Sequence, residues 1–251
     1  PAGAILATSV SKAAPDGYTL LVTGGNLWIG PLLGEMPYDP IRDFATITSP
    51  TKAPNILVIN PSLPVKTVAD LVRLAKARPG ELNYSSGANG SSSHIAGEVF
   101  KSLAGIDIVR IAYKDQATED ADMMAGRVHL NFGVGMSWAA QIKAGKVRPL
   151  ATGGSRRSLL YPDLPTVAEA VPGFVAESLF GLWAPAKTPD NIIRRLNQET
   201  VRALDTTEVR ERLLKIGQEP AVGTPEQFAD AIKAEMARLS KIIQGGAVKT
   251  N

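Results

Sequence analysis

A Gly/Ser/Asn-rich segment, Asn83–Glu98, holds the residues best suited to binding an anion. It begins as a strand end, passes through small polar residues and becomes a helix in which Ile95, Val99 and Leu103 recur every four residues. A helix N-terminus carries unpaired backbone N–H groups and about half a positive charge. The Ser hydroxyls and the Asn89 amide add hydrogen-bond donors without adding charge. The segment is therefore a candidate anion-binding turn.

The same residues also have an ordinary structural interpretation. Ser and Asn are common N-caps and Gly is common in turns, so the segment could simply start a helix that Gly105 ends with a left-handed cap. A second loop, Thr23–Asn26, follows the short apolar strand Tyr18–Val22. Ligands of open α/β sheets bind at such strand ends, but from the residues alone a plain turn is the preferred interpretation there.

Composition narrows the class of protein. The chain has 251 residues, of which 44% are hydrophobic and 20% charged, as in folded soluble proteins. The net charge is only +3 and no long basic run occurs, which argues against a nucleic-acid partner. Cysteine is absent, and the two histidines lack zinc-ligand spacing, so we expect no metal and no cofactor. No run is long enough to cross a bilayer.

Catalysis has a weak basis in the sequence. Ser92 and Ser93 precede His94, but neighbours on a helix point about 100° apart and do not form a dyad. No nucleophile-elbow, P-loop or dinucleotide-binding motif occurs. We interpret His94 as a first-turn residue that is hydrogen-bonded to the loop, and His129 as a structural or exposed residue. No catalytic residue is assigned.

Strands and helices alternate through the middle of the chain. Helices are predicted at Thr67–Arg78, with a capping box from Thr67 and Asp70, and after Ser91. The alternation predicts an α/β domain with parallel strand pairing. Further helices are predicted at Pro1–Ala14, from Thr188-Pro189 with Thr188 as the N-cap, at Thr207–Ile216, and at Thr224–Gln244, which opens with the cap residues Thr224–Gln227. Pro31–Ser49 reads as irregular with one short strand near Ala45–Thr48, and Asn55–Asn60 reads as a buried strand.

Because the C-terminal part is helical, we expect it to pack on the N-terminal strands. This predicts two domains: a discontinuous first lobe of residues 1–56 plus 177–251, and a second lobe of residues 57–176. The two crossings, near Asn55–Ile59 and Ser178–Trp183, would act as hinges.

Several ordered motifs resemble the Bug receptors, the extracytoplasmic solute-binding proteins of tripartite tricarboxylate transporters. They are Ala14–Leu21, Pro37–Phe44, Asn60–Pro64, Ser86–Glu98, Tyr113-Lys114, Leu164–Glu169, Gly181–Ala186 and Thr188-Pro189. The resemblance covers nearly the whole chain.

The resemblance implies a two-domain periplasmic-binding-protein (Venus-flytrap) fold with a ligand cleft between the lobes. It implies a periplasmic, monomeric receptor that binds a small organic carboxylate and delivers it to membrane transporter subunits. In the family, backbone N–H groups and waters hold a carboxylate between a first-domain loop and the Ser/Gly-rich turn. The matching positions here are Gly25 and Asn26 in the loop, and Ser85, Ser86, Gly87, Asn89, Gly90, Ser91, Ser92 and His94 in the turn.

Two departures from the family pattern affect these expectations. The family's first strand, helix and second strand would precede Pro1, so we expect an N-terminal piece to have been removed or left out, and weak or no binding by this chain alone. Gln116 and Gly133 replace residues that tend to meet the far end of the ligand. Gln116 could donate a hydrogen bond and Gly133 would leave room, which favours a ligand bulkier than aspartate and without an ammonium group.

One alternative class stays open at this stage. A small-molecule enzyme, or a ligand-sensing module, can share a two-lobed fold with a receptor, since fold alone does not set function. Turnover that is lost on His94→Ala would indicate the enzyme. A regulator would need a DNA-binding segment, and the sequence contains no sign of one.

Overall fold

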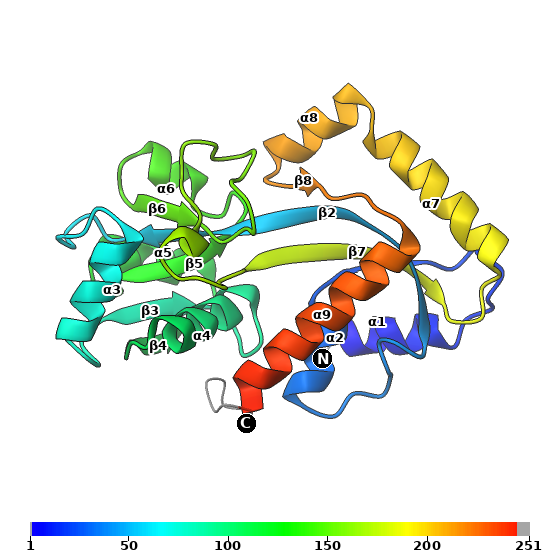
Figure 1. The fold of residues 1–251 in the computed structure, drawn as a ribbon, viewed down its shortest axis with the longest axis horizontal. Helices are drawn as coiled ribbons and strands as arrows, with labels where there is room; N and C mark the ends of the chain where they lie inside the picture. The colour runs from blue at the N-terminus through cyan, green and yellow to red at the C-terminus, as the bar shows by residue number, and fades with distance from the viewer. Residues whose placement is uncertain (1, 245–251) are drawn as a thin grey trace. The chain divides into compact units, whose positions relative to one another are not determined.

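A computed structural model describes residues 2–244 of the chain. The chain forms two compact units: unit 1 is the described part of Pro1–Lys52 and Leu179–Asn251, and unit 2 is Ala53–Ser178. Two strands, β2 (Phe44–Ile59) and β7 (Glu177–Pro185), contribute residues to both units (Figure 1). The long β2 strand replaces the two short strands predicted around Ala45–Thr48 and Asn55–Asn60. Its prolines lose only an N–H, because the carbonyls of Pro50 and Pro54 still accept from Ala221 and Gly135.

Unit 1 combines antiparallel strand pairs with long helices. Its elements besides β2 and β7 are α1 (Ala2–Ser11), β1 (Leu21–Gly24), α2 (Asn26–Leu33), α7 (Asp190–Leu204), α8 (Thr207–Lys215), β8 (Glu219–Pro220) and α9 (Pro225–Gln244). β1 pairs with β7, and β8 pairs with β2, both antiparallel. Helix α2 packs on α9, and Trp28 Nε1 donates to Glu235 Oε2 at 2.8 Å. The unit 1 core includes a cluster of tilted and edge-to-face aromatic rings in which Trp183 and Phe228 have centroids 5.0 Å apart.

Two motifs of unit 1 differ from their predicted structure. The segment Pro31–Ser49, predicted to be irregular, begins inside α2, which includes Pro31 and runs to Leu33. Thr188 does not cap α7: its hydroxyl donates to the Pro185 carbonyl at 2.8 Å, and Pro189 stands at the N-cap. By contrast, the predicted cap of α9 is confirmed, because Thr224 and Gln227 exchange hydrogen bonds.

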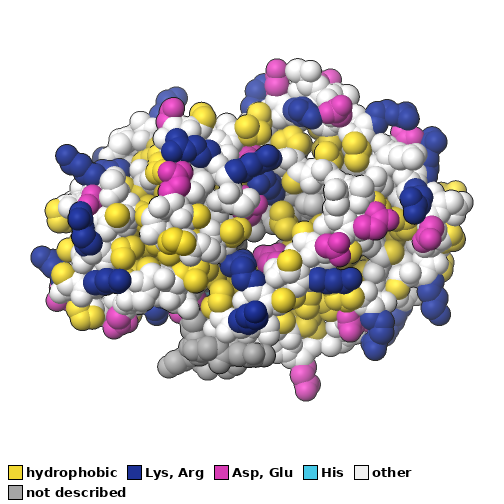
Figure 2. All heavy atoms as spheres, viewed as in Figure 1, with side chains coloured by type: hydrophobic (Ala, Val, Ile, Leu, Met, Phe, Trp, Pro, Cys, Tyr) yellow, Lys and Arg dark blue, Asp and Glu magenta, His cyan; other side chains and the backbone are white. Residues whose placement is uncertain are grey.

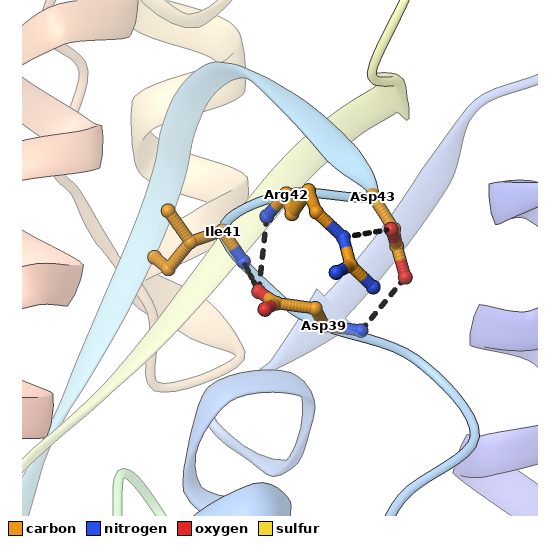
Figure 3. A network of polar contacts seen from close by, with 4 residues as sticks. All are labelled: Asp39, Ile41, Arg42 and Asp43. Carbon is orange, nitrogen blue, oxygen red and sulfur yellow. Dashed lines mark hydrogen bonds and ion pairs between the residues drawn. The ribbon is translucent and has the colours of Figure 1, made fainter.

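The turn before β2 is locked by its own carboxylates (Figure 3). Asp39 Oδ1 accepts from the backbone N–H groups of Ile41 and Arg42 at 2.8 and 3.0 Å, and Asp43 Oδ2 accepts from the Asp39 N–H at 2.8 Å. The hydrogen bonds from Arg42 and then Ile41 lower the pKa of Asp39. This part of the motif Pro37–Phe44 therefore forms a hydrogen-bonded turn directly before β2.

Unit 2 is a three-layer α/β domain. Its elements besides β2 and β7 are α3 (Val68–Ala77), β3 (Asn83–Ser86), α4 (Ser92–Ala104), β4 (Val109–Ala112), α5 (Gln116–Met124), β5 (Leu130–Val134), α6 (Ala139–Lys143), β6 (Arg148–Thr152) and a 3₁₀ turn at Val167–Glu169. β3 runs parallel to β4 and β5, as predicted. β2, however, pairs antiparallel with β5 and β6, so the expectation of parallel pairing throughout is wrong.

Opposite faces of the unit 2 sheet are covered by different helices. α4 packs on β3 and β5, and the Tyr84 hydroxyl donates to the carboxylate of Glu98 on that face. On the other face, Met123 of α5 and Trp138, just before α6, pack with Ile56 and Val58. The capping box of α3, from Thr67 and Asp70, is confirmed.

None of the described helices combines the length and apolar composition needed to cross a bilayer. On the face drawn in Figure 2, Lys and Arg side chains are interspersed with Asp and Glu rather than gathered in one patch.

Candidate functional site

The Ser/Gly-rich turn joins β3 to α4 within unit 2. Ser91 is the N-cap of α4, with an extended backbone, and its hydroxyl accepts from the His94 N–H at 3.3 Å. Gly90 has φ of +77°, a left-handed conformation that favours glycine. At the other end, Gly105 closes the helix in the left-handed conformation, as predicted.

His94 is buried at the base of this turn. Its side chain is 4% exposed, and Nδ1 accepts from the Gly90 N–H at 3.0 Å. Burial and, to a lesser extent, the positive charges of Arg110 and Lys101 together lower the pKa of His94 to about 4. The imidazole is therefore neutral at neutral pH and acts as a hydrogen-bond acceptor, which confirms its interpretation as a first-turn residue bonded to the loop.

We predict that His94 makes the folded state sensitive to acid. Its folded pKa of about 4 lies below its ordinary value of 6.5, so between these pH values the unfolded chain binds a proton that the folded chain does not. Stability should fall as pH drops through this window, by up to about 3 kcal/mol. His94→Asn keeps an acceptor for Gly90 but cannot titrate, so it should remove this loss. Urea unfolding of both proteins at several pH values measures the difference; parallel profiles would contradict the prediction.

The serine hydroxyls of the turn are engaged by other groups. Ser92 Oγ donates to Asn55 Oδ1 at 2.9 Å and accepts from Ser178 Oγ at 2.9 Å. Ser93 Oγ accepts from the Gly87 N–H at 3.2 Å. Neither hydroxyl is hydrogen-bonded to His94, so the turn holds no serine–histidine pair.

Four backbone N–H groups of the turn have no hydrogen-bond partner among residues 2–244. They belong to Ala88, Asn89, Ser92 and Ser93. The last two are the first N–H groups of α4, which no helical carbonyl can reach. Unpaired N–H groups at a helix N-terminus favour an anion by hydrogen bonding and by the helix dipole. Unpaired N–H groups of this kind are the donors that a carboxylate-binding turn would use.

Arg110 is a functional candidate that the sequence analysis missed. From β4 it reaches the turn: Nε donates to Ser86 Oγ at 2.6 Å, one terminal nitrogen to Asn89 Oδ1 at 2.6 Å and the other to the Gly87 carbonyl at 2.8 Å. The parallel register, which sets Arg110 beside Tyr84, directs its side chain to the α4 face. The sequence does show an arginine in the strand that follows the helix of the turn. Placing that arginine at the turn, however, requires knowing that β4 pairs with β3.

Ser85 points away from the turn. It is fully buried, and its Oγ accepts from Asn131 Nδ2 at 3.0 Å on the opposite face of β3 from Tyr84. Asn131 also donates to Glu119 Oε1 at 2.8 Å and accepts from Trp138 Nε1 at 2.8 Å. Burial raises the pKa of Glu119. Ser85 thus belongs to a buried polar network, and the Ser85 hydroxyl does not reach the turn.

The two residues expected at the far end of a ligand also have internal partners. Gln116 Nε2 donates to Asp120 Oδ1 at 2.6 Å on the surface of α5. A Cβ on Gly133 would overlap the Trp138 indole and lie 2.6 Å from Ser137 Oγ. The expectation that Gly133 leaves room for a ligand is therefore wrong, because that room is filled by Trp138.

Of the predicted site residues, Gly25 and Asn26 lie in unit 1 and the other ten in unit 2. Gly25 is the N-cap of α2, and its carbonyl accepts from Trp28 and Ile29. Asn26 is the first residue of α2, with an exposed side chain. In unit 2 the turn brings Ser86, Gly87, Asn89, Gly90, Ser91, Ser92 and His94 together.

Comparison with known proteins decides the family. Residues 1–247 match the family described as the tripartite tricarboxylate transporter family receptor, TctC. This chain belongs to that receptor family. One relative of this chain is Protein BugT of Bordetella pertussis, which is 32% identical over 99% of this chain and 78% of its own length.

Two solved structures of similar proteins are complexes with a carboxylate. One is R. palustris Rpa4515 with adipate, with 36% identity and a TM-score of 0.81 over 96% of this chain and 82% of that chain. The other is MatC from Rhodopseudomonas palustris with bound malate, with 28% identity and a TM-score of 0.73 over 96% and 84%. The predicted fold class, the two-lobed periplasmic-binding-protein fold, is confirmed by these matches.

Proposed function

We propose that this TctC-family receptor binds a small organic carboxylate at the turn between β3 and α4. The observation that carries the proposal is the group of four unpaired N–H groups on Ala88, Asn89, Ser92 and Ser93. A carboxylate has two oxygens with about four acceptor positions, which matches such a group of donors. The adipate and malate bound to similar proteins support a dicarboxylate as the ligand.

We infer that the protein captures its ligand without converting it. The groups that a serine–histidine mechanism would use are engaged in holding the turn: His94 Nδ1 accepts from Gly90, and the Ser92 and Ser93 hydroxyls bond elsewhere. The proposal extends to a periplasmic location and to delivery of the ligand to the membrane subunits of a tripartite tricarboxylate transporter, as membership of the receptor family suggests.

An NMR titration tests the proposed function over a wide range of affinities. Adipate or malate, added up to millimolar concentration, should shift the amide signals of Ala88, Asn89, Ser92 and Ser93. Adipamide, which has the same chain length but no charge, should not shift them. The ligand's own spectrum should stay unchanged during incubation. Unmoved turn amides with every carboxylate tested, or equal shifts with adipamide, would refute carboxylate binding at this turn; a new product signal would indicate an enzyme.

A further inference from the structure

Arg110 contacts the turn through three hydrogen bonds and carries a positive charge that no described carboxylate pairs with. β4 is at one edge of the unit 2 sheet, next to β3 (Figure 1). From there the Arg110 side chain, which is half-buried, contacts three acceptors of the turn. All three acceptors are neutral: a hydroxyl, a side-chain amide oxygen and a backbone carbonyl. Among residues 2–244 no carboxylate forms an ion pair with Arg110.

The nearby charges do not neutralise Arg110. Glu98, on α4, forms an ion pair with Lys101 at 3.5 Å and accepts from the Tyr84 hydroxyl. His94 is neutral, and the Arg110 charge contributes to the lowering of its pKa. With Lys101 balanced by Glu98, the guanidinium leaves one net positive charge beside the unpaired N–H groups. A partly buried cation without a counter-ion is costly, so an anion that supplies the counter-charge is favoured.

We propose that Arg110 is a specificity-determining residue of this receptor, and that its positive charge draws a carboxylate to the turn. This inference rests on the proposed function and adds the group that sets its preference for anions. From the sequence, anion capture was expected from backbone N–H groups, the helix dipole and neutral side-chain donors, without a charged side chain. The structure adds a fixed charge that is hydrogen-bonded to Ser86, Gly87 and Asn89, three residues of the same turn.

Two substitutions distinguish the effect of the Arg110 charge from the effect of its hydrogen-bonding geometry. Arg110→Gln removes the charge, while Arg110→Lys keeps the charge but not the three-way hydrogen bonding. We expect Arg110→Gln to weaken adipate binding roughly ten- to a hundredfold at low salt, and Arg110→Lys to retain most of the affinity. Because salt screens charges, wild-type affinity should fall as ionic strength rises, and Arg110→Gln should flatten this dependence.

Arg148→Gln is a matched control. Arg148 is also a half-buried arginine of unit 2 that donates to neutral carbonyls, those of Val65 and Pro61, but it does so from β6. This substitution changes the net charge equally, so it should leave adipate binding and its salt dependence near wild type.

The experiment follows the amide signals of Ala88, Asn89, Ser92 and Ser93 during adipate titrations at several salt concentrations. The inference is supported if the wild type binds adipate, Arg110→Gln binds it more weakly and Arg110→Lys binds it about as well as the wild type. Equal affinity and salt dependence in wild type and Arg110→Gln, or equal losses in both variants, overturn it while carboxylate binding stands. Wild-type amides that no carboxylate shifts overturn both the inference and the proposed function.

Discussion

Replacing Ser93 by aspartate should abolish carboxylate binding and leave α4 at least as stable as before. Ser93 is in the first turn of α4, where a carboxylate is favoured by the helix dipole and can accept from the unpaired N–H groups. The new side chain would occupy the place proposed for the ligand and would repel its carboxylate. We expect a loss of adipate affinity of about a hundredfold or more, with a melting temperature that is unchanged or raised.

Two control variants separate occupation of the turn from other effects. Ser93→Asn has nearly the same shape as the aspartate but no charge, so it should lose far less affinity. Ser102→Asp adds the same charge to an exposed position in α4, away from the turn, and should have little effect on binding. Calorimetric or NMR titration with adipate, together with thermal unfolding, measures each variant. Wild-type affinity in Ser93→Asp would place the ligand away from these N–H groups.

Local signals predicted the elements of the candidate site well. The run of small polar residues before an apolar stripe predicted the turn and α4, and Gly105 marked the end of the helix. These features depend on hydrogen bonds between residues a few positions apart, which a sequence displays directly. The Thr67–Asp70 capping box is another such case.

Features that depend on contacts between distant segments were not predicted. The antiparallel pairing of β2 with β5 and β6 cannot be read from alternating strands and helices, because that alternation does not say which strands become neighbours. Arg110 reaches the turn only because β4 pairs with β3. Ser85 and Ser86 are adjacent in sequence, but a strand turns successive side chains to opposite faces, so only Ser86 remains with the turn.

The two faces of β3 therefore have different chemistry. On the α4 face, Ser86 accepts from Arg110, whose charge is uncompensated, and the turn above it has unpaired N–H groups. On the α5 face, Ser85 and Asn131 surround Glu119, whose pKa is raised by burial. The first face is suited to receiving an anion. The second is closed by Trp138, and its polar groups satisfy one another.

The largest effect on stability is expected from a substitution on the α5 face of the sheet, where Trp138 packs. Gly133→Ala should destabilise the protein, because the added methyl group would overlap the Trp138 indole, which is 1% exposed and packed in the core. Moving the indole would also break its hydrogen bond to Asn131 Oδ1 and leave buried polar groups unpaired. We expect a loss of about 2 to 4 kcal/mol in the free energy of unfolding, measured in urea.

Gly87→Ala is the matched comparison, because it adds the same methyl group to a glycine of the turn. The nearest atom to that methyl group would be Ser91 Oγ at 3.4 Å, an ordinary contact, and Gly87 does not have a left-handed backbone. Its stability should stay close to that of the wild type. If Gly133→Ala instead kept full stability and lost only adipate affinity, Gly133 would make room for the ligand after all. The packing of Trp138 on Gly133 would then not determine the stability of unit 2.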